Sequence, residues 1–584
     1  MTDRKRPPYS RADAEVDPAR RRVIKGFAAG SLIPLLGGNM LGCAGSSGSA
    51  SDLDAGTAAG FLHGVASGDP LENRVIIWTR ATPATTGPVQ LRWEVATDEA
   101  FTDVVASGGG VTSAATDYTA KVDVDGLSPG ASYFYRFFTG DTASPVGRTK
   151  TLPVGGIESV RLAVLSCANY PAGYFNVYRE VANAELDAVL HLGDYIYEYG
   201  ASGYATARAE EFGRVPEPAT ELLSLSDYRT RYGQYRGDVD LQAAHAAHPF
   251  IVVWDDHEIT NDAWRQGAEN HQPDTEGDYR ERVAAALQAY YEWMPIRPPA
   301  EDREIIYRQF KYGDLVDLLM LDTRLIGRDQ QVNYADFNSE EGFDLPSAMA
   351  AIADSDRTLL GDAQNAWLKE RLKSSTATWQ ALGQQLLMGR YTLPVSAIVS
   401  LDYRNLDIER GRAAVVSTAE AKATPPQQRT PEQQQLVASL VPYNTDAWDG
   451  YGANQSELMD AARAAGSRLV AFAGDTHNAW ASQLKDSGGN TVGVEFATAS
   501  VSSPGIDGRV TSELALELEE PFLTLIDDLH YVNLTDRGYL TVEFTEQAVT
   551  GSWRYVSTIH SKDYTLLDGR AHDITLQADD LRLS

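Results

Sequence analysis

At residues 188–197 the chain reads Ala188-Val189-Leu190-His191-Leu192-Gly193-Asp194-Tyr195-Ile196-Tyr197. An unbroken apolar run of this length fits a strand that is buried on both faces, as in a layered α/β core. Similar runs occur at 162–165, 251–254, 315–321 and 469–472. Helical patterns are present at 281–293 and 361–373. This alternation of buried strands and helices predicts an α/β fold.

Polar residues follow four of these runs, where each strand would end. The four endings read Ser166-Cys167-Ala168-Asn169, Gly193-Asp194-Tyr195-Ile196-Tyr197, Asp255-Asp256-His257-Glu258 and Gly474-Asp475-Thr476-His477. Any one of them could be an ordinary turn or helix cap. Ligands of open α/β folds, however, gather at the carboxyl ends of strands. We therefore expect the four endings to form one functional site.

The endings would bring several carboxylates into one cleft. Such crowding is costly because the charges repel one another and lose their hydration, unless cations neutralise them. Bound metals are the simplest explanation. Two neighbouring metals would clamp a phosphoryl group and activate a water for in-line attack.

The ordered set of motifs resembles the metallophosphoesterase superfamily and, in its details, the PhoD-like alkaline phosphatases, a group that also includes some phospholipase D enzymes. Further matching stretches are 64–70, 254–258, 446–451, 474–480 and 503–505. The resemblance covers roughly residues 61–557. It implies a small, fibronectin-like β-sandwich followed by a two-sheet α/β/β/α catalytic domain.

The resemblance also implies roles for single residues. Asp194 corresponds to a carboxylate that bridges two metals. Cys167, Tyr197 and His477 correspond to ligands of Fe³⁺, and Asp256 and Asp475 to ligands of Ca²⁺. This division is chemically sensible because thiolate, phenolate and imidazole suit a transition metal, whereas hard oxygen ligands suit calcium. The family implies a second calcium, whose ligands the motifs do not reveal.

Other residues at the strand ends have two interpretations each. His257 either donates a proton or holds phosphoryl oxygens, as a catalytic residue, or else supports the ligand beside it. Asn169 either contacts substrate or is structural, and Asp255 either binds metal or caps a turn. Arg324 could hold phosphate, but we expect a structural salt bridge. We expect His191, inside a strand, to be a core residue.

The chain divides into five parts that differ in composition and in the pattern of apolar residues. Residues 61–153 alternate apolar and polar residues in short runs separated by turn residues, which predicts a β-sandwich. Residues 158–558 carry the buried runs and the motifs of the catalytic domain. Residues 44–60 are predicted to be a flexible linker, and residues 559–584 a C-terminal tail.

Residues 1–43 are interpreted as an export signal. Arg20-Arg21-Arg22-Val23-Ile24-Lys25 precedes a short, glycine-rich, moderately apolar stretch, which is a poor membrane anchor. The combination resembles a twin-arginine signal, so we expect export through the Tat machinery to the periplasm or the cell surface. Met40-Leu41-Gly42-Cys43 resembles a lipoprotein cleavage box, so Cys43 is a possible site of lipid attachment.

Composition restricts the function further. The net charge is −31, which argues against specific nucleic-acid binding, since that relies on a basic surface. The resemblance implies an alkaline phosphatase, a phosphomonoesterase with phosphodiesterase activity, that uses a hydroxide held at an iron–calcium centre. The alternatives are a phospholipase D or dedicated phosphodiesterase on the same fold, and an inactive metal-binding protein of the cell surface.

Overall fold

A computed structural model describes residues 59–300, 302–339, 342–400 and 407–583. The predicted export signal, Cys43 and almost all of the predicted linker therefore lie outside the described residues. Within the described ranges, no helix is long and apolar enough to cross a membrane.

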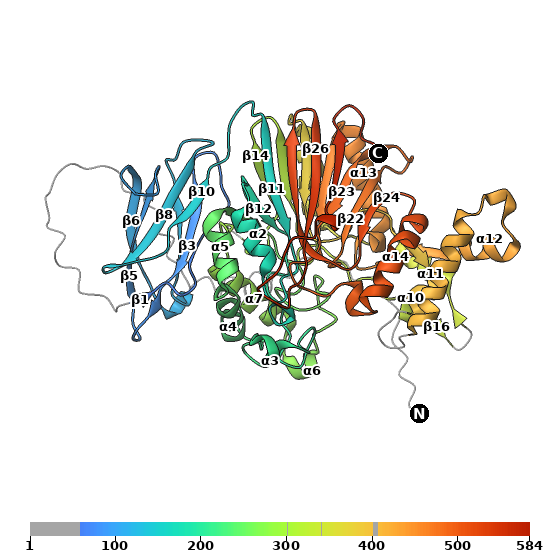
Figure 1. The fold of residues 1–584 in the computed structure, drawn as a ribbon, viewed down its shortest axis with the longest axis horizontal. Helices are drawn as coiled ribbons and strands as arrows, with labels where there is room; N and C mark the ends of the chain where they lie inside the picture. The colour runs from blue at the N-terminus through green and yellow to red at the C-terminus, as the bar shows by residue number, and fades with distance from the viewer. Residues whose placement is uncertain (1–58, 301, 340–341, 401–406, 584) are drawn as a thin grey trace.

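Two large sheets form the centre of the molecule (Figure 1). The first has nine strands in the order β27 (His572–Gln577), β26 (Ala548–Val556), β25 (Arg537–Thr545), β11 (Ser159–Leu165), β12 (Ala188–His191), β13 (Pro249–Val252), β2 (Val65–Gly68), β3 (Val75–Arg80) and β7 (Thr119–Val124). The second has seven strands in the order β14 (Arg308–Tyr312), β15 (Val316–Met320), β18 (Trp379–Gly383), β21 (Leu469–Ala473), β23 (Thr491–Ala497), β22 (Ala479–Lys485) and β24 (Leu529–Asn533).

All five predicted buried strands are present, as β11, β12, β13, β15 and β21. Strand β15, in which Asp317 is the one polar residue, shows why these runs are mainly apolar. Leu318 and Met320 lie in the core between the two sheets, whereas Leu319 lies in the core on the other face of its sheet. Because both faces of each strand are covered, both faces must be apolar.

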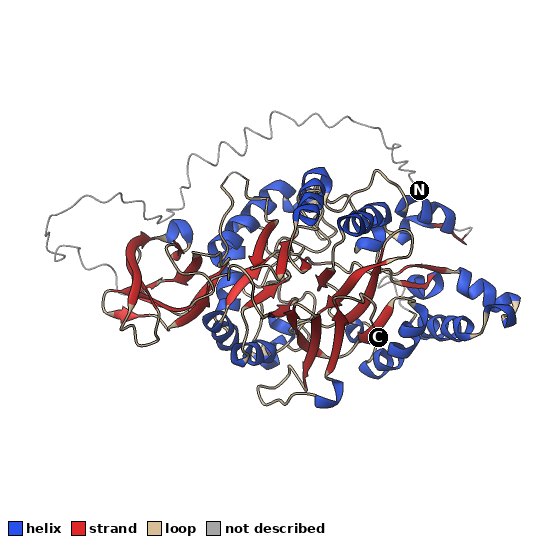
Figure 2. Cartoon of the chain, turned by 90° about the horizontal axis from the view of Figure 1, so that it is seen from above, coloured by secondary structure: helices blue, strands red, loops and turns tan. Residues whose placement is uncertain are grey.

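Helices cover the outer faces of the two sheets, with the strands in the middle of the molecule (Figure 2). The first sheet packs against α2 (Asn176–Asn183), α4 (Leu225–Arg236), α5 (Val239–Ala247) and α7 (Tyr279–Trp293). The second packs against α9 (Gly361–Ser374), α13 (Gly452–Ala465) and α14 (Ser512–Leu525). This is the expected α/β/β/α arrangement, and both helices predicted from the sequence are present as α7 and α9.

The N-terminal region forms the expected β-sandwich. Its outer sheet has the order β10 (Gly147–Lys150), β8 (Ser132–Thr139), β5 (Val89–Ala96) and β6 (Val104–Thr112), with β9 (Thr142–Ala143) beside β8. It packs on β2, β3 and β7 through a core that includes Val65, Ile77, Tyr135 and Phe137. A short pair, β1 (Ala59–Gly60) and β4 (Thr82–Pro83), lies beside it.

The sandwich is not separated from the catalytic region by a linker. Strand β2 pairs in parallel with β13, where Ser67 lies opposite Pro249, so three N-terminal strands extend the nine-stranded sheet. Residues 572–577, predicted to be part of a C-terminal tail, instead form β27 at the other edge of this sheet. Ile574 and Leu576 of β27 are buried in the main core. Both ends of the described chain thus complete one sheet.

The remaining elements lie around this core. The short helices α3 (Ala209–Phe212) and α6 (Pro273–Glu276) lie at the bottom of Figure 1. At the right of Figure 1, an excursion from the second sheet carries α10 (Val395–Ser400), α11 (Ile408–Ala423) and α12 (Pro431–Ala438). The same region holds α8 (Leu345–Ile352) and the two-stranded pairs β16 (Asn338–Ser339) with β17 (Gly342–Phe343) and β19 (Thr392–Pro394) with β20 (Leu440–Pro442).

Candidate metal centre

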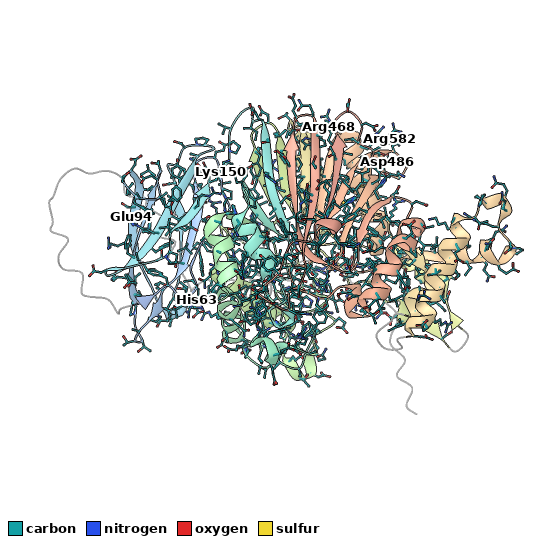
Figure 3. All side chains as sticks on the ribbon, in the orientation of Figure 1. His63, Glu94, Lys150, Arg468, Asp486 and Arg582 are labelled. Carbon is teal, nitrogen blue, oxygen red and sulfur yellow. The ribbon has the colours of Figure 1, made fainter. Side chains whose placement is uncertain are left out.

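Loops from both large sheets meet at the carboxyl ends of the parallel strands. Strands β11, β12 and β13 are parallel neighbours in the first sheet, and β21 has parallel neighbours in the second. Arg468 directly precedes β21, and Figure 3 labels it at the upper end of the sheets. The carboxyl end of β21 therefore lies at the lower end of the sheets in this view. Among the described residues, three groups of side chains each have potential ligand atoms that lie within 4.8 Å of one another: Cys167, Asp194 and His477; Asp194, Asp256 and His257; and Asp255, Asp256 and Asp475.

Two glycines allow the loops to approach so closely. A Cβ on Gly193 would lie 2.3 Å from the backbone nitrogen of Asp255, and the φ of Gly193 is +100°. A Cβ on Gly474 would lie 2.4 Å from Oγ of Ser166, which directly follows β11 of the other sheet. Each Gly-Asp motif therefore needs glycine, because another loop occupies the space that any larger residue would need for its side chain.

The backbone is strained at four predicted metal ligands. Cys167, Asp194, Asp475 and His477 have φ values of 62°, 53°, 58° and 62°, in the left-handed region. A residue with a Cβ pays about 1–2 kcal/mol in this region. Strain of this kind persists where surrounding structure enforces it, and it clusters at functional sites.

Cys167, Asp194, Tyr197 and His477 form what we call the mixed-donor set. The Tyr197 hydroxyl donates to Oδ2 of Asp194 at 2.9 Å and lies 3.1 Å from Nε2 of His477. The set offers sulfur, phenol oxygen, carboxylate oxygen and imidazole nitrogen around one point. These are donors of the kind that transition metals prefer over calcium.

His477 is held with one nitrogen toward this set. Its Nδ1 lies 2.7 Å from the carbonyl oxygen of Pro504, which can only accept, so Nδ1 carries the proton. Its Nε2 is thereby left free to act as a ligand. The Tyr204 hydroxyl donates to the same carbonyl at 2.6 Å, and its ring stacks on His477 at a centroid distance of 6.2 Å.

Burial keeps the Cys167 thiol and the Tyr197 phenol protonated when no cation is present. Burial, together with the Asp194 charge, raises the pKa of Cys167 and that of Tyr197 well above their ordinary values. A metal ion reverses this effect, since a coordinated thiol loses its proton outright. Among the described residues, Oδ1 of Asp194 is buried and has no hydrogen-bond partner. This orphaned oxygen and the donor chemistry fit a bound transition metal.

Asp255, Asp256 and Asp475 form what we call the carboxylate set. Burial raises the pKa of Asp255 and of Asp475 well above the ordinary value. For Asp256, burial is outweighed by the charges of Arg324 and His257, so its pKa is lowered. Oδ2 of Asp255 is buried and, within the described ranges, has no hydrogen-bond partner. Hard oxygens with spare acceptor capacity fit a calcium ion.

Glu258 ties two of the loops together. Its carboxylate accepts hydrogen bonds from the backbone nitrogens of Asp194 at 3.0 Å, Tyr195 at 2.5 Å and Asp255 at 2.7 Å. Burial and the neighbouring Asp194 raise its pKa to about 8. Glu258 was visible in the motif that follows β13, but its role as a support for both ligand loops comes from the structure.

His257 is paired with Glu198, a residue that was not predicted from the sequence to belong to the site. Nδ1 of His257 lies 2.6 Å from Oε2 of Glu198, and the other carboxylate oxygen accepts from Asn261 and Asn270. Burial alone would lower the pKa of His257, but the charges of Glu198, Asp256 and Asp194 outweigh it and raise the pKa well above its ordinary value. The one available signal was that Glu198 directly follows the Gly-Asp-x-x-Tyr motif.

Asn169 is fully buried two residues beyond Cys167. Its side-chain oxygen and nitrogen have no hydrogen-bond partners among the described residues. A buried amide without partners is costly, so a group that is not part of the chain is expected to satisfy it. The prediction that Asn169 contacts substrate is consistent with this orphaned amide.

Arg324 and His191 behave as expected of structural residues. Arg324 is fully buried and bonded to Asp255, Asp446 and Asp475. His191 bonds to the Tyr178 hydroxyl at 2.8 Å, and burial lowers its pKa to about 3, so it is a neutral core residue.

The stretch 446–451 also gains an explanation. Asp446 accepts from Arg324 and Arg328, and the Trp448 indole donates to Gln384 in the core. Asp449 accepts from the backbone nitrogen of Tyr391 at 2.9 Å. Residues 446–451 therefore act as a support beneath the carboxylate set and the loop after β18.

Comparison with known proteins agrees with this architecture. A family model described as PhoD-like phosphatase matches residues 162–553, and one described as the N-terminal domain of PhoD-like phosphatase matches residues 47–153. Alkaline phosphatase D of Bacillus subtilis (strain 168) is 34% identical over 533 residues, which cover 86% of this chain and 81% of that protein.

A solved structure titled "Structure of PhoD" is similar with a TM-score of 0.72 and 32% identity, over 90% of this chain and 92% of that one. The family model of the catalytic region alone matches more than half of the chain, and its limits enclose all the residues of both donor sets. The protein is therefore a hydrolase of phosphoric esters, and the chain belongs to the PhoD-like phosphatase family.

Proposed function

We propose that the protein hydrolyses phosphate monoesters, with phosphodiesterase activity, at a centre of Fe³⁺ and Ca²⁺. The observation that carries this proposal is the position of Asp194. It belongs to the group of ligand atoms with Cys167 and His477 and also to the group with Asp256. One carboxylate thus joins donors suited to a transition metal and donors suited to calcium.

Cys167, Tyr197 and His477 would hold the iron, Asp256 and Asp475 would hold the calcium, and Asp194 would bridge them. When bound, the metals would supply Lewis-acid activation of the phosphate ester and of the attacking water. The strained backbone at four of these residues and the fixed imidazole of His477 support the proposal, because they prepare the donors before a metal arrives.

We assign to His257 the role of general acid, which protonates the leaving group. Its Nδ1 is occupied by Glu198, and it lies in one ligand group with Asp194 and Asp256. Its other nitrogen, Nε2, is then the atom that would give a proton to the departing alkoxide. Glu198 positions the ring and favours the protonated form. Asn169 would donate its amide hydrogen to a phosphoryl oxygen, which would satisfy its orphaned side chain.

The first experiment is hydrolysis of p-nitrophenyl phosphate and its bis-ester by purified protein at alkaline pH, with calcium and with a chelator. We expect calcium-dependent turnover of both, faster for the monoester. Faster cleavage of the diester would favour a dedicated phosphodiesterase or phospholipase D. If fully metallated protein cleaves neither ester, the proposal fails and the alternative of an inactive metal-binding protein gains weight.

We also propose that the protein is exported by the Tat machinery to the periplasm or the cell surface, with lipid attached to Cys43. The support is the resemblance of residues 20–25 and 40–43 to the corresponding signals. Replacing Arg20 and Arg21 with lysine should retain the protein in the cytoplasm. Replacing Cys43 with alanine should move exported protein from the membrane fraction to the soluble fraction. Normal export of the first variant would contradict the Tat assignment.

A further inference from the structure

The guanidinium of Arg324 lies inside the carboxylate set. The side chain is completely buried. Its Nε donates to Oδ1 of Asp255 at 2.5 Å, Nη1 to Oδ2 of Asp446 at 2.8 Å, and Nη2 to Oδ1 of Asp475 at 2.6 Å. The same Nη2 lies 3.7 Å from Oδ1 of Asp256. One cation therefore contacts or approaches every member of the carboxylate set.

This arrangement solves a problem of charge. Several buried carboxylates cannot ionise together without a cation, and a buried guanidinium is equally costly when it is alone. The planar fork of arginine can serve three carboxylates at once, which a lysine ammonium does less well. The backbone of Arg324 is also held in place, because its backbone nitrogen donates to Oδ1 of Asp322 at 2.8 Å.

Calcium would need the same oxygens. Asp475 and Asp256 are the residues that we assign to calcium, and Oδ1 of Asp475 is already bonded to Nη2 of Arg324. A guanidinium and a calcium ion at the same carboxylate oxygens repel each other, so each weakens the binding of the other. Asp446 belongs to none of the three groups of ligand atoms and is shared with Arg328, so it can keep Arg324 nearby.

We infer that Arg324 is a built-in counter-cation, which holds the carboxylate set together without metal and competes with calcium for Asp475. It is a positioning residue that sets calcium affinity. The inference rests on the proposed function, since that function assigns Asp256 and Asp475 to calcium. It predicts that the charge of Arg324 stabilises the metal-free protein and weakens calcium binding.

The test uses the full exported protein, its Arg324→Gln variant and its Arg324→Lys variant. Each is stripped with a chelator, and calcium affinity is measured by titration calorimetry or by competition with a fluorescent chelator. Arg324→Gln should bind calcium at least about tenfold more tightly than the wild type. Arg324→Lys should lie between the two. Unchanged or weaker calcium binding by both variants would overturn the inference.

Thermal unfolding is the second measurement. The stripped Arg324→Gln variant should unfold at a lower temperature than the stripped wild type, and calcium should raise its midpoint by more than it raises that of the wild type. If the glutamine variant folds only with calcium, that result agrees with the inference, and Arg324→Lys then supplies the affinity comparison. An unchanged midpoint for stripped Arg324→Gln would count against the inference.

Arg214→Gln is the matched control. Arg214 is also buried and paired with a carboxylate, Asp238, at 2.6 Å, but neither residue belongs to a group of potential metal ligands. This variant should lose stability and keep wild-type calcium affinity. If neither the wild type nor Arg324→Gln binds calcium, both the proposed calcium site and this inference fail. If both bind it equally, only the inference fails.

Discussion

The two halves of the candidate centre are prepared in different ways. The mixed-donor set is held by hydrogen bonds rather than by a buried cation, such as those of Tyr197 to Asp194 and of His477 to Pro504. The carboxylate set is held by a buried charge, the guanidinium of Arg324. A thiol, a phenol and an imidazole can be packed together uncharged, whereas ionised carboxylates cannot be packed without a cation. The comparison suggests that each half has the preorganisation that its donor chemistry permits.

The largest effect is expected where the two halves meet. Asp194→Ala removes the carboxylate that both groups of ligand atoms share. We expect loss of both metals and a fall in kcat of more than about 10³-fold, beyond the cost of losing one transition-state hydrogen bond. Metal content by mass spectrometry and turnover of p-nitrophenyl phosphate are the measurements. An active Asp194→Ala variant that contains both metals would contradict the assignment of Asp194 as the bridging ligand.

A substitution in only one of the two donor sets should reduce the binding of only one of the two metals. Cys167→Ser replaces a thiolate ligand with a hydroxyl and should lower iron content while calcium affinity stays close to that of the wild type. Asp475→Asn should do the reverse, because it removes one charged oxygen from the carboxylate set. Iron and calcium are measured on the same samples. Equal loss of both metals in both variants would show that the centre assembles as one unit.

Glu198→Gln should affect chemistry but not metal binding. The variant keeps a group that can accept from Nδ1 of His257 but removes the charge that favours the protonated ring. General acid catalysis contributes about 10²–10⁴-fold, so we expect a loss of about 10²-fold for alkyl phosphates. Turnover of p-nitrophenyl phosphate should change little, because its leaving group needs no proton. A loss independent of the leaving group, at normal metal content, would contradict this role.

The smallest effect is expected at two buried carboxyl groups, Asp449 and Glu495, which form no salt bridge among the described residues. Burial raises the pKa of Asp449 from 3.8 to about 8 and that of Glu495 from 4.5 to about 7. The folded protein holds these protons more tightly than the unfolded chain, so stability falls as pH rises through this range and stays low above it. Asp449→Asn should therefore raise Tm by a few degrees at pH 9 but little at pH 5, as measured by thermal unfolding.

Asp98 provides the control of opposite sign. Its exposed carboxylate accepts hydrogen bonds from the backbone nitrogens of Thr102 and Asp103, which lower its pKa. Its contribution to stability is present at high pH and is lost as the pH falls. Asp98→Asn should thus lower Tm slightly at pH 9 and have no effect at the lowest pH. The same pH response for both asparagine variants would refute the assignment of the buried pair.

Local sequence determined the strands and the residues at their ends. The five apolar runs became buried strands because both faces of the central strands are covered, and an apolar run shows this without reference to the rest of the chain. Cys167, Asp194, Asp256 and Asp475 were also identifiable, since parallel strands in a sheet bring their carboxyl ends together.

Tertiary structure alone decided which partners these residues have. Glu198 and His257 are separated by 59 residues, and Arg324 and Asp475 by 151. Neither pair follows from a local period, because each depends on how loops from different strands, or from both sheets, pack at the site. The same holds for Ser67 opposite Pro249, which joins the N-terminal sandwich to the catalytic sheet. Periodicity shows that a strand is buried, but the choice among distant charges and open sheet edges is made only when the chain is packed.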